Sequence, residues 1–270
     1  MLAKTYNSFF YDQLAPGSTR SAYEVVKIVK EMVEPKSVID VGCGIGTWLK
    51  AWSDYGIEEI IGIDGQYVLP KQLLIPVERF KPLDLSSSAQ LASRYKLMDL
   101  KAPSELSNRF DLAQSVEVAE HLPKEVAGAF VSFLCSLAPV VLFGAAIPYQ
   151  SGSEHINEQW PSYWAELFLQ NGYVAIDAIR DRVWNNPNVE SWYCQNTLVY
   201  VQTEHLKTLE GLRDFPVLPP QAVLPRVHPW LWLDKNEKPL FLEKLLAMLP
   251  KSICIFFERA LRKVRRTLAE

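Results

Sequence analysis

A glycine-rich turn that follows a buried strand constrains the fold of this chain more than any other feature. Val38 to Val41 is an apolar run broken only by Asp40, and Gly42-Cys43-Gly44-Ile45-Gly46 follows it before a helical pattern begins at Thr47. Glycines let the backbone approach a ligand closely, and the start of a helix offers N–H groups without partners. The spacing is G-x-G-x-G, whereas dinucleotide-binding enzymes use G-x-G-x-x-G. We therefore expect a nucleotide-type cofactor at this turn.

Strand-like and helix-like segments alternate through the middle of the chain. Apolar runs typical of strands occupy residues 37–41, 59–63, 110–116, 140–146, 173–177 and 197–202, and helical patterns occupy about 47–55, 124–137 and 161–171. Residues 65–109 contain one further strand, in one of two places. Strands joined through helices pair in parallel. The pattern predicts an α/β fold with a mostly parallel, seven-stranded sheet and helices on both faces.

The two ends of the chain differ from this middle part. The opening segment to Gly17 is aromatic and irregular, and Ser21 is a candidate cap for a helix that ends before Pro35. After residue 205 the sequence is rich in proline and then turns helical, and residues 251–270 predict an amphipathic helix with one basic side. We expect three parts: a lid and helix over 1–36, the main domain over 37–205, and a Pro-rich linker with a helical tail over 206–270.

Composition and charge limit the classes of partner. The net charge is −3, and because the last 20 residues are basic, the first 250 carry about −7. Duplex nucleic acid requires a basic footprint, which the motifs lack, so we do not expect a nucleic-acid partner. The four cysteines form no C-x-x-C pair, which favours a cytoplasmic protein. Residues 126–153 are uncharged, and we interpret them as a buried helix, a turn at Pro139 and a buried strand.

The glycine turn resembles motif I of class I S-adenosylmethionine-dependent methyltransferases, which implies their Rossmann-like fold. In that family the acid before the glycines binds the methionine amino group, and Asp40 stands at this position. Asp64, at the end of the next strand, matches the acid that pairs with both ribose hydroxyls. The resemblance thus implies a cofactor site made by Asp40, Gly42, Gly44, Gly46, Asp64 and Gly65.

A third acid in this family reads the adenine amino group at the end of the third strand. Asp84 and Asp99 both qualify, and they belong to the two alternative strands in residues 65–109. Asp99 lies twelve positions before Asp111, a spacing similar to that of relatives, so we expect Asp99 with Leu100 at the adenine.

Two further segments resemble methyltransferases of the ubiquinone-biosynthesis O-methyltransferase-like group. The first is the strand-four motif Phe110 to Pro123, with Glu117, Glu120 and His121, and the second is the loop His155-Ile156-Asn157-Glu158. Ligands of open parallel sheets bind beyond the carboxyl ends of the strands, so we expect Glu117 at the cofactor. His121, His155 and Glu120 are the expected catalytic residues, because a neutral imidazole can remove a proton from a hydroxyl acceptor. Each of these polar residues also has a purely structural alternative, as a cap or a backbone partner.

A divalent cation is a further expectation for the same residues. Glu117, Glu120 and His121 stand at i, i+3 and i+4, which places them on one face if the chain is helical there, and His155 arrives from the neighbouring loop. Carboxylates and imidazoles suit Mg²⁺, Mn²⁺ or Zn²⁺. Without a metal, His121 or His155 remains the base.

The expected function is S-adenosylmethionine-dependent O-methylation of a small molecule such as a sugar, a quinone or a secondary metabolite. The first alternative is a metal-assisted methyltransferase acting on the 2′-hydroxyl at an RNA end, because E-x-x-E-H followed by a histidine also resembles those enzymes. The second is a cofactor-binding protein without turnover. The expected C-terminal helix has two alternative roles. It packs on its own domain or on a second subunit, or it contacts an anionic membrane surface.

Overall fold

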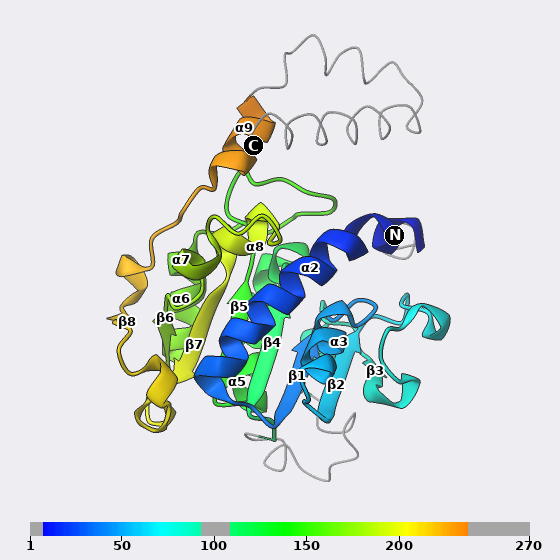
Figure 1. The fold of residues 1–270 in the computed structure, drawn as a ribbon, viewed down its shortest axis with the longest axis horizontal. Helices are drawn as coiled ribbons and strands as arrows, with labels where there is room; N and C mark the ends of the chain where they lie inside the picture. Colours follow the sequence, from blue (N-terminus) through cyan, green and yellow to red (C-terminus); the bar gives the residue numbers. More distant parts are fainter. Residues whose placement is uncertain (1–7, 93–108, 237–270) are drawn as a thin grey trace. The chain divides into compact units, whose positions relative to one another are not determined.

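The computed structural model describes residues 8–92 and 109–236. The chain divides into two compact units, residues 1–228 and residues 229–270. The first unit is built on one eight-stranded sheet (Figure 1), and the short helix α9 (Pro229–Asn236) belongs to the second unit. The helices within the described residues include none that is long and apolar enough to cross a membrane.

The sheet has the strand order β3-β2-β1-β4-β5-β7-β6-β8. The strands are β1 (Ser37–Val41), β2 (Glu59–Asp64), β3 (Phe80–Pro82), β4 (Leu112–Val116), β5 (Val140–Gly144), β6 (Tyr173–Ile176), β7 (Leu198–Gln202) and β8 (Val217–Leu218). The first five are parallel, and β7 runs antiparallel between β5 and β6. The order reverses between β1 and β4, where open α/β sheets bind their ligands.

Helices cover both faces of the sheet, as the sequence predicts. They are α2 (Ser8–Val33), α3 (Thr47–Asp54), α4 (Ser88–Ala92), α5 (Ala127–Leu137), α6 (Pro161–Gln170), α7 (Arg180–Val183) and α8 (Ser191–Asn196). One core forms between the sheet and α5 and α6, and the other between the sheet and α2, α3 and α8. Strand β5 supplies Val141 and Phe143 to the first core and Val140 and Leu142 to the second. A strand buried on both faces reads as a continuous apolar run, which explains its uncharged sequence.

The N-terminal helix differs from its prediction. Helix α2 begins at Ser8 and passes through Pro16, so Ser21 lies inside a helix and does not cap one. The Ser21 hydroxyl donates to the Gly17 carbonyl at 2.8 Å and accepts the Glu190 N–H at 2.9 Å. A serine inside a helix bonds back to the carbonyl four residues earlier, and the tertiary contact with Glu190 holds it there. The prediction began the helix at Ser21 because the segment up to Gly17 shows no regular pattern, whereas the structure has one helix from Ser8 to Val33.

Strands β3 and β8 are the two strands whose positions the sequence leaves open or does not predict. Strand β3 pairs in parallel with β2 from Gly62 opposite Phe80, so the strand beside β2 is the one that precedes Asp84. Asp99 and Leu100 fall outside the described residues, as does the expected amphipathic helix over 251–270. Strand β8, from the Pro-rich segment, pairs with Ala175 and Ile176 and makes the sheet eight-stranded rather than seven-stranded. The first compact unit extends to His228, and the domain boundary expected after residue 205 stays a prediction.

Candidate active site

The glycine turn after β1 has a backbone conformation that residues other than glycine rarely adopt. Gly42, Gly44 and Gly46 have φ angles of 88°, 54° and 86°, in the left-handed region. The N–H groups of Gly42 and Cys43 both donate to the Ile63 carbonyl, at 2.7 and 3.1 Å, which ties the turn to the end of β2. A Cβ atom at Gly42 would lie 2.3 Å from Cγ2 of Val118. The turn therefore sits directly against the segment that follows β4.

Two buried acids lie beside this turn. Asp64 accepts hydrogen bonds from Gly44 N at 2.7 Å, from Gly65 N at 2.6 Å and from the Tyr67 hydroxyl at 2.5 Å, and burial raises its pKa. Burial raises the pKa of Asp40 to about 8, and the charge of Asp64 adds to the shift. Desolvated carboxylates of this kind favour a ligand that brings a positive charge or hydroxyl donors.

Asp84 follows β3 at the same edge of the sheet. It is exposed, and its Oδ1 accepts from Ser86 N at 3.0 Å and from the Ser86 hydroxyl at 2.6 Å. The N–H of Leu83 donates to the Asp64 carbonyl at 2.8 Å, so the acid after β3 is held next to the acid at the end of β2.

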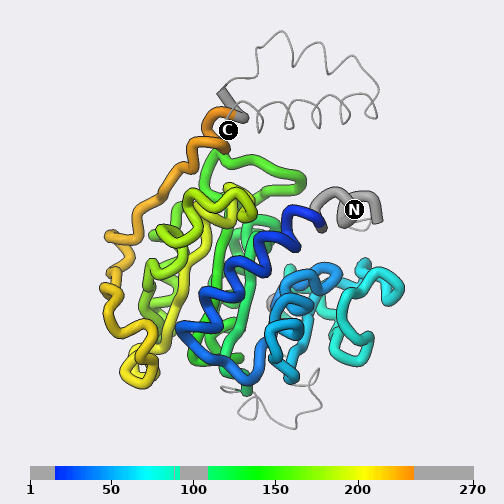
Figure 2. The backbone as a smooth tube through the Cα atoms, in the orientation of Figure 1, coloured from blue at the N-terminus to red at the C-terminus, as the bar shows by residue number. Residues whose placement is uncertain are grey.

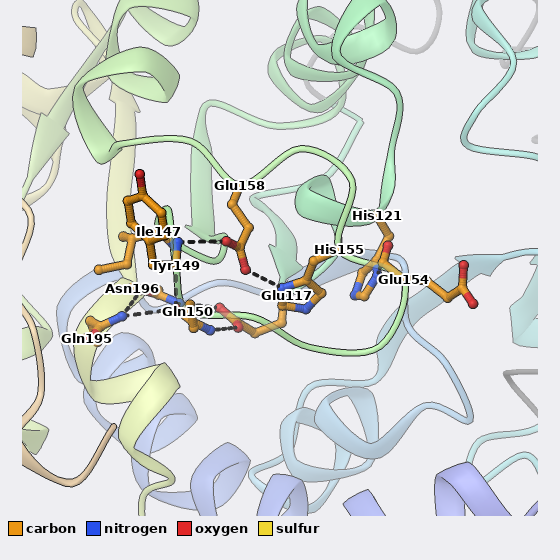
Figure 3. A network of polar contacts seen from close by, with 10 residues as sticks. All are labelled: Glu117, His121, Ile147, Tyr149, Gln150, Glu154, His155, Glu158, Gln195 and Asn196. Carbon is orange, nitrogen blue, oxygen red and sulfur yellow. Dashed lines mark hydrogen bonds and ion pairs between the residues drawn. The ribbon is translucent and has the colours of Figure 1, made fainter. Parts of the chain in front are cut away.

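Glu117, directly after β4, is held by side-chain amides (Figure 3). It has a φ angle of 57°, unusual for a residue with a side chain, and its N–H donates to the Gly144 carbonyl at 2.8 Å. Its carboxylate accepts from Asn196 Nδ2 at 2.8 Å and from Gln150 Nε2 at 3.1 Å. Gln195 supports Gln150 through a 2.9 Å bond. These three amide residues carry no signal in the sequence, because they come from two distant segments and share no spacing.

Glu120 is a buried carboxylate in a short 3₁₀ turn, Ala119–His121. Within the described residues neither of its carboxylate oxygens has a hydrogen-bond partner. Burial raises its pKa well above the usual range, and the charge of Glu117 raises it further. Its backbone carbonyl accepts the N–H groups of Ile156 and Asn157, both at 2.9 Å, which anchors the loop that carries His155. Such a carboxylate needs a proton or a cation as its partner.

The two candidate histidines meet edge to face, with ring centroids 4.8 Å apart. His121 Nδ1 lies 3.2 Å from the Glu154 carbonyl, which can only accept, so this nitrogen carries the hydrogen of the neutral ring. Burial and the neighbouring His155 lower the pKa of His121 to about 4. His155 Nδ1 lies 2.9 Å from Glu158 Oε1.

The structure brings together Glu120, His121 and His155, whose ligand atoms lie within 4.8 Å of one another. The one-face arrangement expected for Glu117, Glu120 and His121 does not occur, because the chain is not α-helical there. Glu117 instead faces the amides. The site lies beyond the carboxyl ends of β4 and β5, where the β5–α6 connection, green in Figure 2, begins.

A family model described as a methyltransferase domain matches residues 19–191, and a comparison with curated proteins found no match. A solved S-adenosylmethionine-dependent methyltransferase from Archaeoglobus fulgidus is 15% identical with a TM-score of 0.52, covering 73% of this chain and all of its own (100%).

Two further structures are similar at lower TM-scores. Magnesium protoporphyrin IX methyltransferase from Synechocystis, with bound S-adenosylhomocysteine, is 16% identical with a TM-score of 0.49, covering 75% of this chain and 98% of its own. An O-methyltransferase family protein from Burkholderia thailandensis is 11% identical with a TM-score of 0.48, covering 72% of this chain and 57% of its own.

Proposed function

This chain belongs to the methyltransferase-domain family and is an S-adenosylmethionine-dependent methyltransferase, and we propose that it methylates a hydroxyl group of a small molecule. The observation that carries the proposal is the pair of histidines beside buried Glu120. A hydroxyl acceptor must lose its proton during transfer, and a neutral imidazole at this position can take it.

The cofactor would lie across the carboxyl ends of β1 and β2. We assign the methionine ammonium to Asp40 and the ribose hydroxyls to Asp64, with the turn at Gly42, Gly44 and Gly46 and the backbone of Gly65 lining the site. The hydrogen-bond capacity and burial of the two acids support this assignment. For the adenine, the position of Asp84 after β3 supports Asp84 as the contact.

The acceptor would enter from the side of β4 and β5. Bound S-adenosylmethionine would supply the methyl group to the acceptor oxygen, with the carbon–sulfur bond broken and S-adenosylhomocysteine as the neutral leaving group. The acceptor proton passes to an imidazole nitrogen of His121 or His155, and Glu120 lies beside both rings. The protein contributes mainly by holding acceptor and methyl group in line.

A divalent cation fits three of these side chains. The two unpartnered oxygens of Glu120 and the two imidazoles form a donor set that suits Mn²⁺, Mg²⁺ or Zn²⁺, and we propose Glu120, His121 and His155 as its ligands. Both Nδ1 atoms already face oxygen acceptors, as is usual for metal-binding histidines. A bound cation would lower the pKa of the acceptor hydroxyl.

The function is tested with S-adenosylmethionine labelled in its methyl group and a panel of sugars, quinols and phenols. We expect the label in an ether of one of these, with turnover reduced about a hundredfold or more in His155→Ala. Labelling of a carboxylate or a nitrogen alone, or of only the 2′-hydroxyl of a short RNA, would refute the proposal.

The cation is tested on the full chain without an acceptor. Calorimetry with Mn²⁺ should show binding that Glu120→Gln and His155→Ala each weaken, while the exposed Glu125→Gln leaves it unchanged. Equal binding by all four proteins would remove the metal from the site.

We also propose a cytoplasmic location and an interaction role for residues 251–270. Three cysteines, Cys43, Cys135 and Cys194, are buried as free thiols, which supports a reducing compartment. The amphipathic, basic sequence of the tail supports either self-association or contact with an anionic membrane. Flotation with anionic vesicles, compared with a version that ends at Pro250, distinguishes the two.

A further inference from the structure

One carboxylate, that of Glu158, links Tyr149 and His155 within the connection between β5 and α6. Glu158 Oε2 accepts the backbone N–H of Tyr149 at 2.8 Å, and Glu158 Oε1 lies 2.9 Å from His155 Nδ1 (Figure 3). The side chains of His155 and Glu158 are only 12% and 18% exposed, so water competes weakly for these contacts. The link therefore fixes both the loop and the ring.

The loop between these two contacts has an unusual backbone. Tyr149, Ser151 and Glu154 all have positive φ angles, of 69°, 50° and 61°, which side-chain-bearing residues adopt only when surrounding contacts impose them. A Cβ atom at Gly152 would lie 2.3 Å from His155 Nε2, so only glycine leaves room beside this nitrogen. The loop is shaped around the His155 ring.

We propose that Glu158 is a positioning residue that holds His155 in the tautomer with hydrogen on Nδ1 and a lone pair on Nε2. A carboxylate only accepts hydrogen bonds, so a neutral His155 satisfies Glu158 only by donating from Nδ1. The Tyr149 N–H occupies the other carboxylate oxygen and keeps Oε1 turned toward the ring. The remaining nitrogen, Nε2, is the atom that can take a proton or bind a cation beside His121 and Glu120.

This inference rests on the proposed function for its purpose, because it states which atom of His155 serves the acceptor. Its geometry and its test do not require the acceptor to be known. The tautomer assignment can fail while the proposed methyl transfer stands, and the methyl transfer can fail while the tautomer assignment stands.

The test is nitrogen NMR of the full-length protein with ¹⁵N-labelled histidine, at a pH where the rings are neutral. Wild-type His155, assigned with the His155→Ala variant, should show a protonated Nδ1 and an unprotonated Nε2. In Glu158→Gln the amide oxygen still accepts the Tyr149 N–H, so its NH₂ group faces Nδ1. The His155 ring should then change to the opposite tautomer, while Glu125→Gln, an exposed control, should match wild type.

Two outcomes would overturn the proposal: a wild-type His155 with hydrogen mainly on Nε2, or a folded Glu158→Gln variant that keeps the wild-type tautomer. If Glu158→Gln does not fold, the wild-type spectrum still decides the tautomer. Binding of S-adenosylhomocysteine should be equal in wild type and Glu158→Gln, and its absence from both would count against the cofactor site alone. With an acceptor, kcat should fall about a hundredfold while KM changes little, because the base is lost and not the binding surface.

Discussion

Asp40 is a buried carboxyl group whose ionisation inside the core is unfavourable. Its pKa of about 8 lies above the ordinary 3.8, so between these pH values the folded protein keeps a proton that the unfolded chain has released. Asp40 therefore costs the fold least at low pH, where it is protonated in both states, and the free energy of unfolding falls by about 1.4 kcal/mol per pH unit as the pH rises through this window.

Asp40→Asn should remove this slope because an amide does not ionise. We expect urea unfolding to give similar stability for variant and wild type near pH 4 and a more stable variant at pH 8, by a few kcal/mol at most. The same variant should bind S-adenosylmethionine more weakly. A stability difference that stays constant between the two pH values would contradict this assignment.

Asp64 is the residue on which we expect cofactor affinity to depend most. Asp64→Ala leaves the ribose hydroxyls without their acceptor and releases the Gly44 and Gly65 N–H groups, at a cost of about 1–3 kcal/mol in binding free energy. Calorimetry with S-adenosylhomocysteine measures this directly. Asp84→Ala should weaken binding less, because Asp84 is exposed, and undiminished binding by Asp64→Ala would disprove the ribose assignment.

Sequence patterns predicted the glycine turn, whose conformation is local, and missed residues that depend on distant contacts. The spacing of Gly42, Gly44 and Gly46 predicts a turn. The acidic residues near the ends of the strands could be located from the predicted ends of those strands. Gln150 and Asn196 could not be found this way, because their amides matter only where the fold brings them to Glu117. The helical spacing assumed for Glu117, Glu120 and His121 failed because a left-handed residue at 117 precedes the 3₁₀ turn.

At the scale of elements, the starts of β1 and β4 are joined by one side chain. Asp111 Oδ2 accepts from Lys36 N, Ser37 N and the Ser37 hydroxyl, at 2.8, 3.0 and 3.1 Å. The hydroxyl in turn accepts the Asp111 N–H at 3.0 Å. This reciprocal link holds β1 and β4 together, the two strands between which the strand order reverses. It lies at their amino ends, whereas the site lies at the carboxyl ends.

Asp111→Ala should destabilise the protein by about 2–3 kcal/mol, because two backbone N–H groups and a hydroxyl lose a charged acceptor. Urea unfolding measures the loss, and affinity for S-adenosylhomocysteine should stay close to wild type in the variant that remains folded. A change in unfolding free energy below about 0.5 kcal/mol would show that the link contributes little.

Elements were predictable where hydrophobic periodicity is strong. Strands β1, β2, β4, β5, β6 and β7 were found within two residues, because each is an apolar run with turn residues on either side. The length of α2 was not predictable, since its passage through Pro16 depends on contacts such as that between Ser21 and Glu190. Strand β8 has two residues among prolines, too few for any period to appear.

At the scale of the whole molecule, residues 206–228 belong to the first compact unit. Arg226 bonds to Asp177 and Asp181, and His228 contacts the Trp184 carbonyl at 2.8 Å and donates its backbone N–H to Gln195 at 2.9 Å. Through Gln195, this segment reaches the amides that hold Glu117.

A version that ends at His228 should therefore fold cooperatively and bind S-adenosylhomocysteine like the full chain. A version that ends at residue 205 should be less stable and bind more weakly, because it loses β8, Arg226 and the Gln195 contact. Thermal unfolding and calorimetry compare the three proteins. Equal behaviour of the version ending at residue 205 would support the boundary expected from the sequence.

Among the described residues, the outermost strands of the sheet are β3 and β8, and both are poor templates for aggregation. Strand β3 ends at Pro82, and β8 lies between Pro216 and Pro219, so each rim is short and carries residues without an N–H to donate. A strand from another molecule would find too few backbone groups to form a ladder on either side. The rims formed by these two described strands therefore offer little backbone for pairing between copies of this protein.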